Sequence, residues 1–114
     1  MEGCLFCNII KGEIPSSKVY EDDYVYAFND ISPVAPVHVL IIPKKHISRL
    51  DEINEENSIY VAKIFEVAAK IAKESGLNEH GYRIVSNCGE AAGQTVFHIH
   101  YHLLGGRDLA WPPG

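Results

Sequence analysis

Apolar and polar residues alternate along the chain in a way that predicts several short strands and one long helix. Residues 57–75 carry apolar side chains at a helical period, with Gly76 as terminator, and residues 4–11 predict a short helix ending at Gly12. The segments expected to form strands are 18–28 (two strands around an acidic turn), 37–43, 81–87 and 96–104. This order predicts a single α+β domain, residues 1–114, with a mostly antiparallel sheet of about five strands, one long helix and one short helix.

The last of these segments is unusual because three of its polar positions are histidines. His98, His100 and His102 alternate with apolar residues, so in a strand their imidazoles would share one face. The ordinary alternative is a solvated face that merely carries histidines. Half of the chain's 6 histidines at period two instead favour a chemical site, because imidazole titrates near neutrality and is the commonest metal ligand.

The spacing of the three histidines along a strand limits how many of them can bind the same metal ion. Residues two apart are separated by about 6.6 Å, so His98 and His102 would lie about 13 Å apart at the backbone. Imidazole–zinc bonds are only about 2.0–2.1 Å long. Two neighbouring histidines can share an ion, but three on a nearly straight strand cannot. The pattern therefore indicates that at least one of them does something other than bind metal.

A second chemical signal is the pair Cys4 and Cys7, spaced as Cys-x-x-Cys. Such a pair is half of a zinc site and needs two further ligands. The alternatives are a redox pair, whose typical βαβ context is not evident here, and two small buried thiols. We favour zinc, but the spacing alone does not select the remaining ligands among His38, His46, His80 and the three alternating histidines.

A glycine-bearing loop over residues 87–95 leads into the histidines. Glycine lets backbone N–H groups turn toward an anion, and the side chains of Asn87, Gln94 and Thr95 add neutral donors. The loop does not match the Gly-x-x-x-x-Gly-Lys-Ser/Thr pattern of a P-loop. On this pattern alone a plain connection is the default and a phosphate site the alternative.

Composition limits the class of partner. With 15 acidic and 10 basic residues the formal net charge is −5, which argues against binding along DNA or RNA but not against a small nucleotide. The longest apolar run, residues 37–43, is too short to cross a membrane. Residues 1–4 lack the basic start of a secretory signal, and 3 cysteines suit a reducing compartment. We therefore expect a soluble cytoplasmic domain.

Taken together, these motifs resemble the histidine-triad (HIT) family, whose signature is His-φ-His-φ-His-φ-φ with φ apolar. Residues 98–104 fit that signature at every position. The tail over residues 104–114, with its Leu-Gly-Gly-Arg and Trp-Pro-Pro-Gly, is most similar to the Hint branch. Further segments that carry the resemblance are 6–15, 28–33, 42–48 and 93–98. The resemblance thus covers nearly the whole chain.

The resemblance implies a homodimer whose two sheets join into one. It also implies an enzyme that hydrolyses purine nucleoside 5′-phosphoramidates, with AMP or GMP and an amine as products. His100 would attack the α-phosphorus and form a nucleotidyl-histidine intermediate. His102 and His38 would line the α-phosphate, and His102 would also be available for proton transfer. The other phosphate-side positions that match the family are Asn87, Gly93, Gln94 and Thr95.

The nucleoside part of the site follows from the same resemblance. Asp30 would hold the ribose hydroxyls, because a carboxylate offers two acceptor oxygens; its ordinary alternative is a turn residue before Ser-Pro. The base would enter an apolar slot whose members would each otherwise be assigned to the core, namely Phe6, Ile9, Ile14, Phe28 and Leu40.

Members of the family with Cys-x-x-Cys at this position are similar to one another in binding zinc, whereas eukaryotic Hint relatives lack the cysteines. For this chain the resemblance implies that the ligands are Cys4, Cys7, His46 and His98. Four protein ligands make a closed, structural site with no coordination position for substrate. Zinc would then hold the segment that presents His100 without being the catalyst.

Two functions of other kinds remain as alternatives. One is a non-catalytic nucleotide-binding or scaffold dimer, which the intact histidine triad disfavours. The other is the cleavage of dinucleoside polyphosphates, which the Hint-like tail disfavours.

Overall fold

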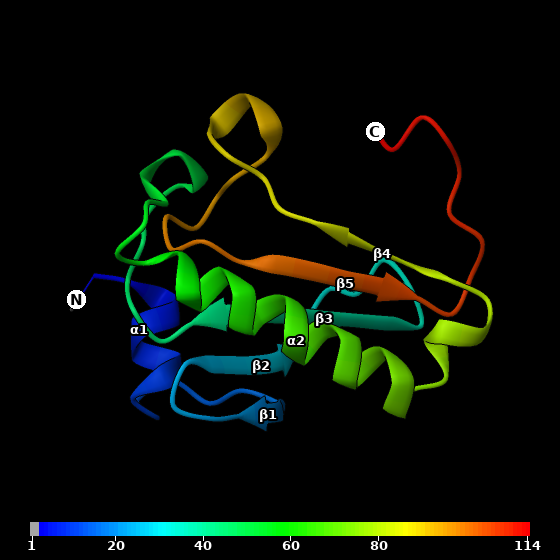
Figure 1. Cartoon of the computed structure of the whole chain (residues 1–114), viewed down its shortest axis with the longest axis horizontal. Coiled ribbons are helices and arrows are strands. Elements are labelled where there is room, and N and C mark those ends of the chain that lie inside the picture. The colour runs from blue at the N-terminus through cyan, green and yellow to red at the C-terminus, as the bar shows by residue number, and fades with distance from the viewer. Residues whose placement is uncertain (1–2) are drawn as a thin grey trace.

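The computed structural model describes residues 3–114 and contains a five-stranded antiparallel sheet with one long and one short helix (Figure 1). The helices are α1 (Leu5–Ile10) and α2 (Ser58–Glu74), and single turns of 3-10 helix occupy Leu50–Glu52, Leu77–Glu79 and Glu90–Ala92. In spatial order the strands are β1 (Lys18–Glu21), β2 (Val25–Asn29), β3 (Val37–Pro43), β5 (Tyr101–Gly105) and β4 (Tyr82–Val85). The predicted α+β fold is confirmed. Met1 and Glu2, on which the predictions of a single domain and of no secretory leader partly depend, lie outside the described residues.

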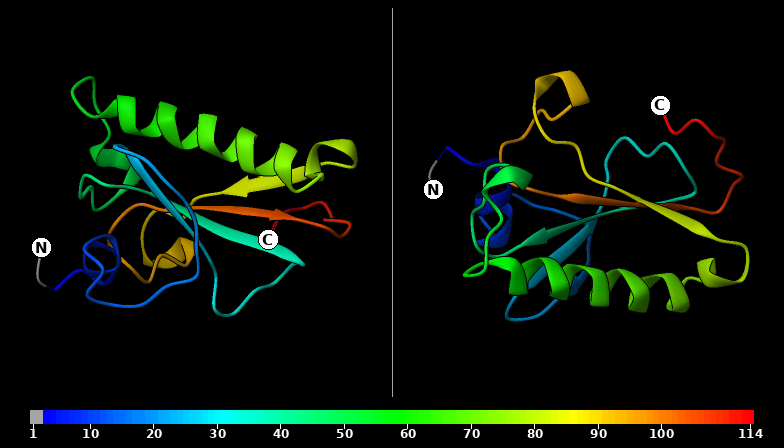
Figure 2. Two further views of the ribbon diagram at one scale, coloured as in Figure 1. Left: turned by 90° about the horizontal axis from the view of Figure 1, so that it is seen from below. Right: turned by 45° about the horizontal axis from the view of Figure 1, so that its top comes forward.

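Alternation along β3 separates the two faces of the sheet. Val39 and Ile41 belong to the core beneath α2, whereas Leu40 and Ile42 pack with α1. Figure 2 shows α2 along one face of the sheet and α1 on the other. Because β3 is central and covered on both sides, its sequence is a continuous apolar run rather than an alternating one. His38 has the parity of Leu40 and interrupts this run on the α1 face.

Both helices end as their sequences predict. The Cys4 thiol caps the start of α1 by accepting a hydrogen bond from the backbone N–H of Cys7 (3.3 Å). The residues after the helices include Gly12 (φ +81°) and Gly76 (φ +74°), in the left-handed conformation that favours glycine. The cap of α1 brings its two cysteines together at the start of the helix. In the described part of the chain, no helix is long and apolar enough to cross a membrane.

The segment that carries the histidines is only partly a strand. The prediction of one strand over residues 96–104 is wrong for its first half, since β5 begins at Tyr101 and residues 96–98 form a bend. The reason is that the backbone before β5 bonds to a loop: the Ile99 N–H donates to the Ile47 carbonyl (2.7 Å) instead of to a neighbouring strand. The three histidines therefore do not stand on one straight strand.

β4 is also shorter than predicted. It covers Tyr82–Val85 rather than residues 81–87. Ser86 leaves the ladder and donates its hydroxyl to the His100 carbonyl (2.8 Å). The chain then turns away from the sheet into the loop over residues 87–95, which starts beside His100.

The apolar surface of α2 is wider than the sheet can cover. The side chains that pack into the core are Ile64, Val67, Ala68, Ile71 and Ala72. Ile59 and Phe65 belong to the same apolar pattern but are 46% and 47% exposed. Phe65 packs edge-on against Tyr101 of β5, with ring centroids 5.5 Å apart, and its outer face is open. At Phe65 the helix therefore presents an uncovered apolar side chain beside β5.

Candidate active site and metal centre

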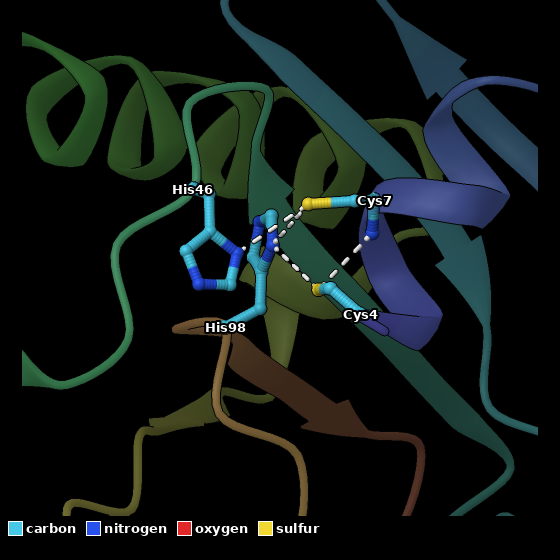
Figure 3. A group of neighbouring side chains, drawn as sticks. All are labelled: Cys4, Cys7, His46 and His98. Atoms are coloured by element: carbon cyan, nitrogen blue, oxygen red, sulfur yellow. Dashed lines mark hydrogen bonds between the residues drawn. The ribbon is translucent and has the colours of Figure 1, made fainter. Parts of the chain in front are cut away.

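Two cysteines and two histidines meet at the start of α1 (Figure 3). Cys4 and Cys7 come from α1 and its cap, His46 from the segment after β3, and His98 from the bend before β5. The four ligand atoms all lie within 4.8 Å of one another. The Sγ to Nδ1 distances are 3.4 Å for Cys4–His98, 3.4 Å for Cys7–His46 and 3.5 Å for Cys7–His98.

These separations fit a tetrahedral metal ion. With Zn–S bonds of about 2.3 Å and Zn–N bonds of about 2.0–2.1 Å, tetrahedral angles place sulfur and nitrogen ligands about 3.6 Å apart. The three distances of 3.4–3.5 Å between the cysteine sulfurs and histidine nitrogens are close to that value. Two thiolates and two imidazoles are also the donor set that suits zinc. The cluster can therefore hold a metal ion of this kind.

The far nitrogens of both histidines are anchored in the way that metal ligands require. His98 Nε2 donates to the Pro43 carbonyl (2.8 Å), and His46 Nε2 lies 3.2 Å from Ser48 Oγ, which can accept a hydrogen bond from it. A carbonyl only accepts, so the proton of His98 is on Nε2 and its Nδ1 lone pair faces the sulfurs. Each ring thus turns a lone pair toward the centre of the cluster.

Burial sets the protonation of this cluster. His98 is completely buried, and this burial lowers its pKa to about 4, so the ring is neutral at pH 7 and can act as a ligand. Burial raises the pKa of the Cys7 thiol, and the adjacent Cys4 raises it further. A divalent cation reverses that preference, because it stabilises a coordinating thiolate directly.

His100 is held as a neutral imidazole with its lone pair in a fixed place. Its Nδ1 lies 2.9 Å from the His98 carbonyl oxygen, which can only accept, so Nδ1 carries the proton and Nε2 the lone pair. Burial lowers the pKa of His100, which is 8% exposed, and the ring is therefore uncharged at neutral pH. A neutral imidazole with a directed lone pair can serve as a nucleophile or as a base.

His38 and His102 form a second cluster with Asp30. His38 Nε2 lies 2.9 Å from His102 Nδ1 and 3.4 Å from Asp30 Oδ2. By proximity alone these three side chains could also hold a metal ion. The backbone argues for another use, because the Val34 N–H donates to His38 Nδ1 (3.1 Å).

This backbone donor assigns the protons of the cluster. Since the Val34 N–H occupies the Nδ1 lone pair, neutral His38 carries its own proton on Nε2 and donates it to His102. His102 then carries its proton on Nε2. Burial lowers the pKa of His102 to about 4, and the neighbouring His100 and His38 act in the same direction. The cluster is thus a directed chain of hydrogen bonds, with no lone pair on His38 left for a metal.

An apolar pocket of about 190 Å³ lies between α1 and the sheet. Phe6 joins it to the histidines, because its ring packs edge-on to that of His100 with centroids 5.0 Å apart. Asp30 stands at its side, with Oδ1 accepting from the Ser32 N–H (2.7 Å). The walls include all five apolar residues expected for the base, namely Phe6, Ile9, Ile14, Phe28 and Leu40. A larger hollow, of about 440 Å³, lies between β1 and α2 on the opposite face of the sheet and contains none of the predicted site residues.

The loop over residues 87–95 supplies a mixed set of groups. Thr95 is exposed and Asn87 half-buried, and Gly93 has the left-handed φ of +93°. Gln94 differs from them, because its side chain is only 2% exposed and bonds entirely within the protein. The structure therefore places Gln94 beneath the loop rather than at its surface.

Comparison with known proteins gives this architecture a family. The HIT domain model matches residues 11–109. The chain belongs to the HIT family. The purine nucleoside phosphoramidase of Escherichia coli K12 is 49% identical over 108 residues, which cover 95% of this chain and 91% of that protein.

Two HIT family hydrolases of known structure are similar throughout. The one from Legionella pneumophila has a TM-score of 0.96 and 53% identity, with 98% of this chain and 100% of that chain covered. The one from Clostridium thermocellum has a TM-score of 0.94 and 57% identity, with 96% of each covered.

Several groups that fix the HIT histidines escaped the sequence reasoning. They are mainly backbone atoms: the Val34 N–H and the carbonyls of Pro43 and His98. A backbone group carries no side-chain signature, so no sequence pattern could have found them. Ser48 was predictable only as part of the Pro-Lys-Lys-His-Ile-Ser segment. Of the remaining reactive residues, Cys88 is half-buried in the loop and His80 is exposed, and neither joins the two clusters.

Proposed function

We propose that this chain is a nucleotide hydrolase that cleaves purine nucleoside 5′-phosphoramidates and releases AMP or GMP together with an amine. The observation that carries the proposal is the fixed state of His100: a neutral ring whose Nε2 lone pair is free beside an apolar pocket. The name of the Escherichia coli relative, purine nucleoside phosphoramidase, supports the same substrate class.

In the proposed complex, the base occupies the apolar pocket and the nucleotide runs from there toward the histidines. Asp30, at the edge of the pocket, binds the ribose hydroxyls with its carboxylate. The α-phosphate lies beside His100 and His102, where Asn87, Gly93 and Thr95 of the loop contribute donors. Gln94 supports this loop from beneath, and His38 acts on the phosphate through His102.

The first chemical step is attack by His100 Nε2 on the α-phosphorus. The new N–P bond forms as the P–N bond to the amine breaks, giving a nucleotidyl-histidine. An amine leaves poorly as an anion, so it must take up a proton as it departs. The negative charge of the bound phosphate raises the pKa of His102 above its value of about 4, so the ring takes up a second proton, on Nδ1, while the His38 Nε2 proton turns to Asp30 Oδ2 (3.4 Å). The resulting imidazolium delivers its Nε2 proton to the amine and becomes neutral.

The second step returns the enzyme to its starting state. Water attacks the phosphorus, His102 accepts a proton from it, and the bond to His100 breaks to release the mononucleotide. The Nδ1–H of His100 donates to the His98 carbonyl throughout, so the Nε2 lone pair is restored in the same direction.

A panel of substrates tests this activity. The chain should release AMP from adenosine 5′-phosphoramidates, including AMP joined to a lysine amine, and GMP from the guanosine compounds. Diadenosine polyphosphates should be cleaved at least about tenfold more slowly, by a comparison of kcat/KM values. Binding of AMP without turnover on any phosphoramidate would instead support a nucleotide-binding scaffold.

We further propose that Cys4, Cys7, His46 and His98 hold a structural zinc ion. The distances and the anchored far nitrogens described above support this donor set. When bound, zinc supplies a rigid link between α1 and the segment before His100. With four protein ligands it has no position for substrate.

A homodimer is the proposed assembly. β4 ends the sheet in this chain, pairing only with β5 among the described strands, so its outer edge is available for a second sheet. Phe65 of α2, which is nearly half exposed, packs against Tyr101 of β5, the strand next to that edge. Apolar surface next to an unpaired edge is what a two-fold contact between sheets buries.

Phe65→Glu should convert the dimer into monomers at micromolar concentration, because it places a charge on the exposed apolar side chain that is proposed to face the partner. Sedimentation velocity or light scattering measures the change in mass. Lys70→Glu is the matched control: it adds the same side chain to α2, but on the side where Lys70 lies over the Tyr20 ring, and should leave the dimer intact. Equal behaviour of the two variants would contradict the proposed interface.

The lowered pKa of His102 predicts a dependence of stability on pH. Burial holds this pKa at about 4 in the folded chain, whereas the unfolded chain has a value near 6.5. Between pH 4 and 6.5 the unfolded state binds more protons, so the free energy of unfolding falls as the pH is lowered through this range. Between pH 7 and pH 4, the free energy of unfolding of His102→Gln, measured by urea titration, should fall by about 2 kcal/mol less than that of wild type.

The exposed His80 offers a control for this pH effect. His80→Gln should lose as much stability as wild type between the same two pH values. Protonation of the proposed metal ligands lowers the free energy of unfolding of wild type, His102→Gln and His80→Gln alike, so it cancels when their losses are compared. An equal loss for wild type and His102→Gln would show that His102 is not held neutral by the fold.

A further inference from the structure

Gln94 is the buried polar residue at which the metal centre and the loop over residues 87–95 meet. Its Nε2 donates to the Ser48 carbonyl (2.8 Å) and the Val96 carbonyl (3.1 Å), and its Oε1 accepts from the Gly89 N–H (2.8 Å). All three partners are backbone groups, and the side chain is 2% exposed. The amide therefore holds three separate stretches of chain in one place.

Two of these stretches carry proposed metal ligands. Ser48 follows His46 by two residues, and its hydroxyl lies 3.2 Å from His46 Nε2. Val96 precedes His98 by two residues, within the bend before β5. A bound ion would fix His46 and His98 relative to each other, and with them the two carbonyls that accept from Gln94 Nε2.

The third stretch is the loop that we propose to contact the phosphate. Gly89 accepts two further backbone hydrogen bonds at its carbonyl, from Ala92 (3.2 Å) and Gln94 (3.0 Å), so its position defines the turn that leads to Gly93. When Gln94 is in place, the Gly89 N–H is satisfied and the turn is closed. When its amide partners move apart, that N–H loses its acceptor inside the protein, which is costly for a buried group.

We propose that Gln94 is a positioning residue that couples the metal centre to the nucleotide site, so that metal binding and nucleotide binding strengthen each other. This inference rests on the proposed function, because it assigns the loop to the phosphate. The coupling is reciprocal: the ligand that orders one side of Gln94 lowers the cost of ordering the other.

The test compares two buried amides. Gln94→Met keeps the length of the side chain and removes its three hydrogen bonds. Asn57→Leu is the matched control, since Asn57 is 7% exposed and also joins backbone groups, accepting from the Asn54 N–H (2.8 Å) and donating to the Glu52 carbonyl (3.1 Å). The loop that Asn57 holds contains no proposed residue of either site, and its contact with Ser48, from the Ser48 N–H to Glu52 Oε1 (3.2 Å), is exposed. This variant therefore reports the loss of a buried amide that does not hold the Ser48 carbonyl.

Zinc affinity, measured by competition with a chromophoric chelator and with no nucleotide present, is the first readout. It should fall by at least about tenfold in Gln94→Met, as for other groups that orient metal ligands, and stay within about twofold of wild type in Asn57→Leu. The second readout is the affinity for AMP with and without zinc. Removing zinc should weaken AMP binding about tenfold in wild type and in Asn57→Leu, but less than threefold in Gln94→Met.

Zinc affinity within twofold of wild type in Gln94→Met, or an equal loss in both variants, would overturn the inference. An unchanged zinc dependence of AMP binding in Gln94→Met would overturn it as well. If wild type does not bind AMP at all, the proposed function fails, and the zinc competition still decides whether Gln94 positions the metal ligands.

Discussion

His100→Ala should reduce the hydrolysis of adenosine 5′-phosphoramidate by at least about a thousandfold, because it removes the only atom proposed to bond to phosphorus. The Nε2 of His100 carries a free lone pair in a fixed direction, since the Nδ1–H donates a hydrogen bond to the His98 carbonyl (2.9 Å). His102 is the nearest substitute, but its Nδ1 accepts from His38 and its Nε2 carries a proton. Neither nitrogen of His102 can therefore replace the missing nucleophile. Initial rates of AMP release measure the effect.

The control separates loss of chemistry from loss of structure. His100→Ala should still bind AMP and keep a Tm within a few degrees of wild type, while His80→Ala should keep the full rate because His80 is exposed and belongs to neither cluster. Acid-quenched wild type should carry a nucleotide bound to His100, detected by mass spectrometry of the peptide, and His100→Ala should carry none. Turnover within tenfold of wild type in His100→Ala would end the proposal of a nucleotidyl-histidine.

The parts of the fold that the sequence could predict are those set by side-chain patterns. β3 has the continuous apolar run of a strand buried on both faces, and α2 has a helical apolar period followed by Gly76 at φ +74°. Gly12 at φ +81° likewise marks the end of α1. In each case the local preference and the packing agree, so the pattern was sufficient.

The segment before β5 shows where such patterns fail. Period-two alternation records which way side chains face, but it does not record whether the backbone has a neighbouring strand. At residues 96–98 the chain bends, and Ile99 bonds to Ile47 in a loop. The bend carries His98 to the cysteines while His102 stays in the sheet. That separation is the result of long-range contacts, which a single sequence does not contain.

The candidate site divides in the same way. The resemblance identified the side chains that the structure brings together, but it could not rank their tasks. His38 was expected to line the phosphate, whereas its Nε2 is directed at His102 and it is 7% exposed. The group that decides this is the Val34 N–H, a backbone donor on an exposed loop residue. A backbone N–H is present in every residue except proline, so the role of the Val34 N–H depends on geometry and cannot be read from the residue type.

Cys7→Ser should abolish stable zinc binding and lower the Tm by about 10 °C or more. Cys7 Sγ lies between two proposed ligands, 3.4 Å from His46 Nδ1 and 3.5 Å from His98 Nδ1, so its loss opens the cluster on both sides. A serine hydroxyl does not ionise to give the soft ligand that zinc prefers. Zinc content by atomic emission and thermal unfolding by calorimetry measure the two effects.

A chelator distinguishes loss of the ion from loss of a buried thiol. Wild type treated with chelator should unfold at nearly the temperature of Cys7→Ser, whereas Cys7→Ser itself should not respond, because it has no ion to lose. Cys88→Ser should keep both the zinc content and the chelator response, since the half-buried Cys88 lies outside the cluster. If the chelator leaves the Tm of wild type unchanged, then packing alone holds α1 against the segment before His100, and the four residues are not a structural metal site.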